Sequence, residues 1–543
     1  LTLDDTVFTS NGVSTLKIYD LEGTQPLTVT ASALSAGNNI TVYSKNAASK
    51  NDSFTGGAGD DLFVFSTISD ADVIDGSDTI AGGKGSDTLY ITATTIAGNI
   101  TITTAVTSVE NFTFVGVDST ALTYTLADAS IVTSTLQGNN GIVDASGMTG
   151  TGALTFSANA ENDSGLTITG GRAGDTLTGG NATASAFSGA ALFDTIKGGD
   201  GADIIDGKAG IDVLHGEGGN DTFTVSTNTD FLSLTAAETV DGGAGTDTIS
   251  FDVDGATTVI AADLAGIKDV EVLKFTGDNT VSLTLSDSVF TANGSSSITV
   301  WEEEASQPLT LAAGGLSSAN SVKVKINTTT GDADVTEAVT LGAGDDTVTY
   351  HSAQRLDTAD VIAFGGGTDT LAVYINNTAL SATLTNVSSV ENITLVQVTT
   401  NTATITLADG NFVSTQAGVI DAAATAGVLT LDADAEDDSS LTIKGGTGAD
   451  IITGTDATLS GSTVLGDTIT GGNGADIITG SLGADTLTGG AGADVFSYDT
   501  YSDSSGSYVD DITDFLDGTD LISITIDRSS ITTAQTITPN VTA

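Results

Sequence analysis

Apolar and polar residues alternate over short runs along most of the chain. Runs such as Ile100–Thr104, Ala121–Leu126 and Leu166–Gly171 place Ile, Leu or Tyr at every second position, with Thr between them. This two-residue period is typical of β-strands that bury one face. The 3.6-residue period of helices is rare, so we expect helix to be a minor component, at Leu316–Asn320 and at Leu232–Glu238.

A second pattern, with a period of nine residues, occupies Gly198–Phe223. A glycine-rich turn, an aspartate and an apolar pair return in each period, with the aspartates at Asp194, Asp203, Asp212 and Asp221. Glycine permits the positive-φ turn, and the pairs Ile-Ile, Val-Leu and Thr-Phe suit a short strand. We therefore expect each nonapeptide to form half a coil of a parallel β-roll, with aspartates eighteen residues apart stacked on one edge.

The same nine-residue beat recurs at Gly445–Phe496, where it carries Asp467, Asp476, Asp485 and Asp494. A flexible Gly/Asp-rich linker is the alternative by composition, but linkers do not hold Ile, Leu, Val and Phe in fixed phase. A column of carboxylates and turn carbonyls is a hard-oxygen environment that suits Ca²⁺, which takes about six to eight oxygen ligands. The pattern therefore predicts calcium sites along the edges of the roll.

These nonapeptides resemble the RTX calcium-binding repeats, G-G-x-G-x-D-x-U-x. The resemblance implies an all-β fold, a parallel β-solenoid of the β-roll or β-helix type, that holds several Ca²⁺ ions as its cofactors. Shorter turns elsewhere in the chain keep part of the motif and extend the prediction to their aspartates. The predicted calcium ligands are Asp61, Asp78, Asp87, Asp175, Asp194, Asp203, Asp212, Asp221, Asp247, Asp346, Asp360, Asp369, Asp450, Asp467, Asp476, Asp485 and Asp494.

The chain also contains longer repeats. LTLDDTVFTSNG at Leu1–Gly12 returns as LTLSDSVFTANG at Leu283–Gly294, which indicates a tandem duplication. Three complete copies, at Gly82–Val132, Gly242–Phe290 and Gly365–Val413, share a Val-Glu element, SVENFTF, DVEVLKF or SVENITL. Because the start of the chain matches only the end of a copy, we expect the sequence to begin inside a larger protein.

These patterns divide the chain into seven expected segments. They are residues 1–54 (the tail of a truncated β repeat), 55–168 (short RTX turns and β-rungs), 169–250 (a long RTX β-roll block), 251–340 (β-rungs), 341–444 (short RTX turns and β-rungs), 445–497 (a second long β-roll block) and 498–543 (a C-terminal cap or type I secretion region). We expect the rungs to continue one parallel solenoid. A series of separate antiparallel sandwiches is the alternative.

The C-terminal stretch Asp494–Ile524 is similar to the segment that follows RTX repeats in serralysin-type proteases and other proteins exported by type I secretion. It carries the elements F-x-Y, D-x-I-x-D-F and G-x-D-x-I. The resemblance implies an export signal at this end of the protein. A cap over the open end of the solenoid is the structural alternative, and the two roles are compatible.

The charge of the chain indicates which classes of partner it can bind. Its 14 basic and 70 acidic residues give a net charge of −56. Nucleic acid and anionic membranes are therefore disfavoured, and cations are favoured. There is no cysteine, so ion binding is the available substitute for disulfides. No apolar run reaches the roughly 18 residues of a membrane helix, so we expect no membrane insertion. A calcium-rich exterior suits weak, repeated calcium sites, so we expect an extracellular location.

Catalytic motifs are absent from the sequence. The two histidines, His215 and His351, cannot build an H-E-x-x-H zinc helix, and neither G-x-S-x-G nor a phosphate-binding loop occurs. The resemblance to serralysins therefore covers the repeats and the C-terminal segment and does not extend to their catalytic domain. The acid pairs Asp60–Asp61 and Asp345–Asp346 lie in RTX turns, and Glu302–Glu304 is interpreted as an acidic loop. We expect a protein that is not an enzyme.

Taken together, the repeats resemble those of RTX-type surface-layer (S-layer) proteins of Gram-negative bacteria, which leave the cell by type I secretion, fold on meeting calcium and self-assemble into a two-dimensional lattice. The resemblance implies Ca²⁺ and further copies of the chain as partners, and cell-surface polysaccharide through a region preceding Leu1. A large RTX adhesin or filament that uses the repeats as a spacer is the first alternative. The C-terminal part of a secreted hydrolase is the second.

Overall fold

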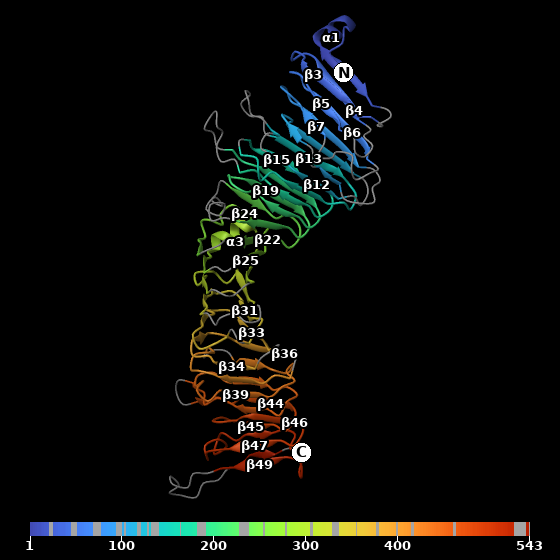
Figure 1. The fold of residues 1–543 in the computed structure, drawn as a ribbon. Helices are drawn as coiled ribbons and strands as arrows, with labels where there is room; N and C mark the ends of the chain where they lie inside the picture. The colour runs from blue at the N-terminus through green and yellow to red at the C-terminus, as the bar shows by residue number, and fades with distance from the viewer. Residues whose placement is uncertain are drawn as a thin grey trace. The chain divides into compact units, whose positions relative to one another are not determined.

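The computed structural model describes the chain except for 22 short segments (Figure 1). The segments left out are residues 21–24, 45–50, 69–77, 94–99, 103–104, 117–120, 128–129, 132–140, 163, 182–191, 227–237, 253–255, 277–279, 304–307, 328–335, 354–355, 376–378, 398–399, 414–416, 460–462, 526–538 and 542–543.

The chain forms two compact units. The first comprises residues 1–253, 262–273 and 292–295, and the second comprises residues 254–261, 274–291 and 296–543. Each unit is a stack of coils in which the chain adds one strand to each of its sheets in turn, and together they contain about 17 turns. In Figure 1 the successive strands β45, β47 and β49 of the second unit lie side by side.

The strands of the first unit belong to three sheets. The first sheet has β1 (Thr2–Asp4), β3 (Thr28–Ala33), β5 (Ser53–Thr55), β7 (Thr79–Ala81) and β10 (Ala105–Thr107). The second has β2 (Thr15–Tyr19), β4 (Asn39–Ser44), β6 (Leu62–Ile68), β8 (Thr88–Ala93), β11 (Asn111–Gly116), β13 (Gly141–Met148), β15 (Leu166–Thr169), β17 (Thr195–Asp200), β19 (Val213–Gly218), β21 (Thr239–Asp241) and β24 (Ile267–Lys268). The third has β9 (Ile100–Ile102), β12 (Leu122–Thr125), β14 (Leu154–Ser157), β16 (Thr176–Thr178), β18 (Ile204–Asp206), β20 (Thr222–Val225) and β22 (Thr248–Asp252).

The remaining strands follow the same scheme. One series has β25 (Val272–Thr276), β27 (Ser297–Glu302), β29 (Ser321–Ile326), β31 (Thr347–Tyr350), β33 (Thr370–Ile375), β36 (Asn392–Gln397), β38 (Gly418–Asp421), β40 (Leu441–Lys444), β44 (Thr468–Asn473), β46 (Thr486–Ala491), β48 (Asp511–Ile512) and β50 (Asn540–Val541). A second has β23 (Thr257–Val259), β26 (Val281–Thr284), β28 (Leu309–Ala312), β30 (Ala338–Thr340), β32 (Val361–Ala363) and β35 (Val387–Ser388). A third has β34 (Leu380–Thr383), β37 (Ala403–Thr406), β39 (Leu429–Asp432), β41 (Ile451–Thr453), β45 (Ile477–Thr479), β47 (Val495–Tyr498) and β49 (Leu521–Ile524). A short pair, β42 (Thr458–Leu459) and β43 (Thr463–Val464), stands apart and is antiparallel.

The pairing in the two long nonapeptide blocks is parallel, with the predicted register. Thr195 of β17 lies opposite Val213 of β19, and Thr468 of β44 lies opposite Thr486 of β46. Both offsets are eighteen residues, the length of two nonapeptides. The prediction of an all-β parallel solenoid is confirmed, and the alternative of separate antiparallel sandwiches is wrong.

The core is built from the alternate apolar positions. Ile196, Leu214 and Val240 lie in register on neighbouring strands and are at most 5% exposed. The residues between them in sequence, such as His215, face outward. Stacking of one coil on the next therefore gives each inward side chain an apolar neighbour above and below it, which removes its surface from water.

The two described helices fall where they were not expected. Helices α1 (Asp5–Asn11) and α3 (Asp287–Asn293) occupy equivalent places in the two copies of the duplicated segment. Asp4 caps α1 by accepting a hydrogen bond from the amide of Thr6, and Gly12 ends it in the left-handed conformation (φ 64°). Among the described residues, no helix is long and apolar enough to span a membrane.

The helix predicted at Leu316–Asn320 is wrong. This stretch is a turn, closed by a hydrogen bond from the amide of Asn320 to the carbonyl of Ser317 at 3.0 Å. The two glycines that precede it, Gly314 and Gly315, disfavour a helix. The other predicted helix, Leu232–Glu238, lies outside the described residues except for Glu238.

Candidate metal sites

The aspartates of the first long block form a hydrogen-bonded column along one edge of the solenoid. Oδ1 of Asp203 accepts a hydrogen bond from the backbone amide of Asp175 at 2.6 Å. Oδ1 of Asp221 accepts from Asp203 at 2.8 Å, and Oδ1 of Asp247 accepts from Asp221 at 2.8 Å. We call such a series an aspartate column. Each member fixes the turn of the preceding coil, so the side chains stack as the eighteen-residue spacing predicts.

The same arrangement recurs on other edges. Asp194 donates its amide to Oδ1 of Asp212 at 2.7 Å. In the second long block the columns contain Asp450, Asp476 and Asp494 on one edge, and Asp467 and Asp485 on another. The shorter turns give the pairs Asp61–Asp87 and Asp346–Asp369. Asp78 accepts from the amide of Asp52, and Asp360 accepts from the amide of Glu337. All seventeen predicted ligands are at most 4% exposed.

The first aspartate has both oxygens engaged by the protein in five columns, whereas Oδ2 of Asp346 has no hydrogen-bond donor. In Asp61, for example, Oδ1 accepts from the amide of Ile40 and Oδ2 from the amide of Gly57, both at 2.7 Å. Asp175, Asp194, Asp450 and Asp467 are bonded in the same way. Asp360 also uses both oxygens, accepting from Glu337, Asp357 and Tyr350. These carboxylates are held without any further partner.

Later members of the columns are different, because one buried oxygen has no hydrogen-bond donor. Within the described residues this holds for Oδ2 of nine aspartates: Asp87, Asp203, Asp221, Asp247, Asp369, Asp476, Asp485, Asp494 and Asp510. None of the nine forms an ion pair with a lysine or arginine in that part of the chain. A buried carboxylate oxygen without a partner is strongly unfavourable.

Glycine brings a second oxygen to five of these free carboxylate oxygens, those of Asp87, Asp203, Asp221, Asp247 and Asp476. A Cβ atom placed on Gly198 would come within 3.0 Å of both Oδ2 of Asp203 and the carbonyl oxygen of Gly216 in the next coil. A Cβ on Gly216 would meet Oδ2 of Asp221 and the carbonyl oxygen of Gly242 in the same way. A carboxylate oxygen and a carbonyl oxygen thus converge beside the first glycine of these loops. Only glycine leaves room for this approach.

The titration of these side chains reflects their burial. Loss of hydration, together with a smaller contribution from neighbouring carboxylates, raises the pKa of Asp203 to about 7 and that of Asp369 to about 7. The same cause raises the pKa of Asp87 to about 8. The protein alone therefore does not compensate the charge of these groups at neutral pH.

The donor set fits a hard divalent cation. Among the described residues, no three acidic or histidine side chains gather into a metal-binding cluster. An ion at these positions must therefore take backbone carbonyl oxygens as ligands beside the aspartate. Carboxylate and carbonyl oxygens are the ligands of Ca²⁺, whereas transition metals favour imidazole or thiolate.

Near the C-terminus, the columns also include acidic residues that lie outside the nine-residue period. Oδ1 of Asp510 accepts from the amide of Asp485 at 3.0 Å, and Oδ1 of Asp520 accepts from the amide of Asp494 at 3.0 Å. Asp514 accepts from the amides of Gly489 and Gly490. These three acids belong to the D-x-I-x-D-F and G-x-D-x-I elements, so this segment covers the last coils. The cap interpretation is consistent with these contacts.

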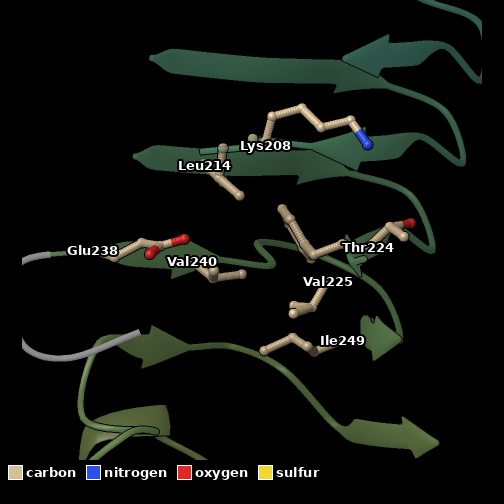
Figure 2. Close-up of a pocket in the computed structure, with 9 residues that line it drawn as sticks. Lys208, Leu214, Thr224, Val225, Glu238, Val240 and Ile249 are labelled. Carbon is tan, nitrogen blue, oxygen red and sulfur yellow. The ribbon is translucent and has the colours of Figure 1, made fainter. Parts of the chain in front are cut away.

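A cavity in the first long block has no room for an organic substrate. It measures about 20 Å³, which is about the space of one water molecule. Figure 2 shows Leu214, Val225, Val240 and Ile249 turned toward one another around it. The remaining lining residues are Gly207, Lys208, Phe223, Thr224 and Glu238. It is an irregularity of the apolar core.

Comparison with known proteins identifies the nonapeptides. A family model described as the RTX calcium-binding nonapeptide repeat (4 copies) matches residues 46–65, 73–90, 189–232, 442–457 and 465–496. No match was found among curated proteins. The matched residues cover parts of both long blocks and two short turns near the N-terminus. The turns at residues 242–247, 342–346 and 365–369 lie outside them.

Proposed function

Because the chain carries RTX repeats, which bind several calcium ions, we propose that it is a secreted structural protein that folds on binding Ca²⁺ and assembles into a two-dimensional lattice on the bacterial cell surface. The observation that carries the proposal is the set of buried Oδ2 atoms without partners in the aspartate columns. Their charge makes the solenoid dependent on an external cation.

Each site uses residues of two successive coils. Oδ1 of Asp221 holds the amide of Asp203, which orients the Asp221 side chain, and its Oδ2 remains available beside Gly216. The missing side chain of Gly216 lets the carbonyl oxygen of Gly242 approach the same point. A bound Ca²⁺ would supply the positive charge that offsets the buried carboxylates there.

The negative charge of the chain accounts both for its export in an unfolded state and for its folding outside the cell. At low calcium the carboxylates of a column repel one another, and the net charge of −56 opposes compaction of the chain. Such a chain stays unfolded and fit for type I secretion. Outside the cell, ion binding stabilises the folded state by linkage, so binding free energy becomes folding free energy.

An exposed apolar row supports self-assembly. Ile451, Ile477, Val495 and Leu521 lie in register on neighbouring strands β41, β45, β47 and β49. Ile451, Ile477 and Leu521 are 43%, 40% and 57% exposed. Val495, which lies between Ile477 and Leu521, is half-buried. Exposed apolar side chains gathered in one row are typical of a protein contact surface. We include a second copy of the chain and cell-surface polysaccharide among the partners of the proposed lattice.

The proposal assigns no catalytic role. The acid pair Asp60–Asp61 is placed in a turn where both oxygens of Asp61 accept backbone hydrogen bonds. Burial lowers the pKa of His351, which stacks on Tyr374 with ring centroids 5.0 Å apart. A parallel solenoid of RTX repeats is typically a structural fold.

Electron microscopy tests the lattice. Purified protein is imaged by negative stain in millimolar calcium and after chelation; ordered sheets that dissolve in chelator are expected. Ile477→Ser should weaken the sheets while leaving the circular dichroism of the calcium-bound protein unchanged, because this side chain is exposed. Single rods or head-to-tail fibres in calcium would contradict the lattice and favour an adhesin or filament.

A further inference from the structure

Glutamates of the Val-Glu elements take the place of aspartates at the end of three columns. We call the three turns that hold them, Ser108–Glu110, Asp269–Glu271 and Ser389–Glu391, the V-E turns. In each turn, Oε2 of the glutamate accepts a hydrogen bond from the backbone amide of the last aspartate of the column. The three bonds are Asp87 to Glu110 at 2.9 Å, Asp247 to Glu271 at 2.8 Å and Asp369 to Glu391 at 2.8 Å.

The first two V-E turns also bring a carbonyl oxygen to the free carboxylate oxygen. A Cβ on Gly82 would come within 3.0 Å of both Oδ2 of Asp87 and the carbonyl oxygen of Ser108. This is the convergence of oxygens that the nonapeptide loops show, but the carbonyl now comes from a turn without the glycine motif.

The second V-E turn repeats this geometry. A Cβ on Gly242 would come within 3.0 Å of Oδ2 of Asp247 and of the carbonyl oxygen of Asp269. Asp87 and Asp247 are both 0% exposed, and their Oδ2 atoms have no hydrogen-bond partner. A buried carboxylate oxygen that lies beside a carbonyl oxygen and has no hydrogen-bond donor calls for a cation.

The V-E turns are built to hold this conformation. Ser108 and Asp269 adopt positive φ angles of 51° and 50°, which are unfavourable for residues other than glycine. In the second turn the buried side chain of Asn293 accepts a hydrogen bond from the amide of Val270 at 2.8 Å and donates one to its carbonyl oxygen. The carbonyl of the neighbouring Asp269 is thereby fixed in direction.

We propose that the V-E turns at Ser108–Glu110 and Asp269–Glu271 each complete a further Ca²⁺ site. The ligands are the free oxygen of the last column aspartate, the turn carbonyl and the glutamate carboxylate. Neither glutamate lies within the residues matched by the RTX repeat model. The inference rests on calcium binding by the repeats and is independent of the proposed lattice.

The third V-E turn provides a natural comparison. It keeps the contact between Asp369 and Glu391, but Phe364 occupies the position of Gly82 and Gly242. The amide of Phe364 donates to the carbonyl of Ser388, as that of Gly242 donates to Lys268. A Cβ atom therefore stands where the oxygens of the other two turns converge, and we assign no site there.

Counting bound calcium on the full chain tests the proposal. Glu110→Gln and Glu271→Gln keep the length of the side chain and its hydrogen-bond acceptor but remove its charge. Equilibrium dialysis against radioactive calcium should show one ion fewer per chain for each variant and two fewer for the double variant. Glu391→Gln, which makes the same change at the turn without an assigned site, should bind as many ions as the parent.

The comparison with Glu391→Gln decides the outcome even where folding is disturbed. If the glutamates act only as hydrogen-bond acceptors, all three variants will keep the calcium count of the parent, or all three will be impaired alike. Either result would overturn the proposal. Because the count is made in solution, the presence or absence of sheets in the microscope does not affect it.

Discussion

The backbone amide of Asp203 donates a hydrogen bond to Oδ1 of Asp221, which follows it by eighteen residues, at 2.8 Å. The other oxygen of Asp221 is buried beside Gly216 and has no partner. One carboxylate thus joins two coils through one oxygen and presents the other to a cation. The same group therefore couples the fold of the solenoid to calcium.

Substitution of Asp203 separates these two roles. Asp203→Asn keeps an acceptor for the amide of Asp175 but removes the charge, so the calcium concentration at the midpoint of folding should rise. Asp203→Ala also leaves that buried amide without an acceptor, which costs about 1–3 kcal/mol more. Calcium titrations followed by circular dichroism measure the folding midpoint of both variants. The exposed Asp252→Asn should behave as the parent, and an Asp203→Asn midpoint equal to it would refute the charge argument.

The first glycine of a loop should tolerate no side chain. Gly216→Ala places a Cβ against Oδ2 of Asp221 and the carbonyl oxygen of Gly242, so we expect a loss of stability of about 1–3 kcal/mol and weaker calcium binding. Gly37→Ala is the matched control, because no atom lies within 4 Å of its Cβ position. Urea unfolding at saturating calcium measures the free energy of unfolding of both variants. Equal stabilities would show that the close approach of the two oxygens is not required.

The duplication supplies a control for Asn293. This side chain is 0% exposed and holds both backbone groups of Val270, whereas the equivalent Asn11 is exposed and donates to the carbonyl of Val7. Asn293→Ala should lower the free energy of unfolding by about 1–3 kcal/mol for each group left unsatisfied. Asn11→Ala should change it much less. The interpretation fails if the two variants lose the same stability.

Without calcium the fold should be more stable in acid than at neutral pH. Burial raises the pKa of Asp87 to about 8 and that of Asp476 to about 6, whereas an unfolded aspartate titrates near 3.9. Between about pH 4 and pH 8 the folded state holds more protons than the unfolded state, so stability falls as pH rises through this window. Circular dichroism of chelated protein should show structure near pH 4 that is lost by pH 8. A chelated fold that strengthens toward pH 8 would contradict this linkage.

The nine-residue period was enough to predict the parallel coils and the stacking of Asp203 on Asp221. The spacing of the aspartates and the positions of the glycines determine both features. The V-E glutamates were visible only as a shared element. Their separations from the column aspartates are 23, 24 and 22 residues, which is no fixed period. Near the C-terminus, Asp510 follows Asp485 by 25 residues and Asp520 follows Asp494 by 26. These separations also differ from eighteen, so the nine-residue period does not predict them.

Helix α3 was missed for a different reason. The stretch before it, Leu283–Leu285, alternates like a strand and does continue from β26, and seven residues are too few for the helical period to stand out. Its polar start at Ser286 and Asp287 and the glycine that follows, Gly294 (φ 77°), are the signals of a capped helix. Tertiary contacts rather than helix propensity stabilise so short an element.

The most direct test of the account is a calcium titration of the intact chain at neutral pH. Far-ultraviolet circular dichroism reports the strands, and the emission of the single tryptophan, Trp301 in β27, reports the second unit. We expect little β-structure in chelator and a cooperative gain in both signals on addition of millimolar calcium, which magnesium at the same concentration does not reproduce. Full β-structure and unchanged Trp301 emission in chelator would contradict the claim that the aspartate columns need calcium to fold.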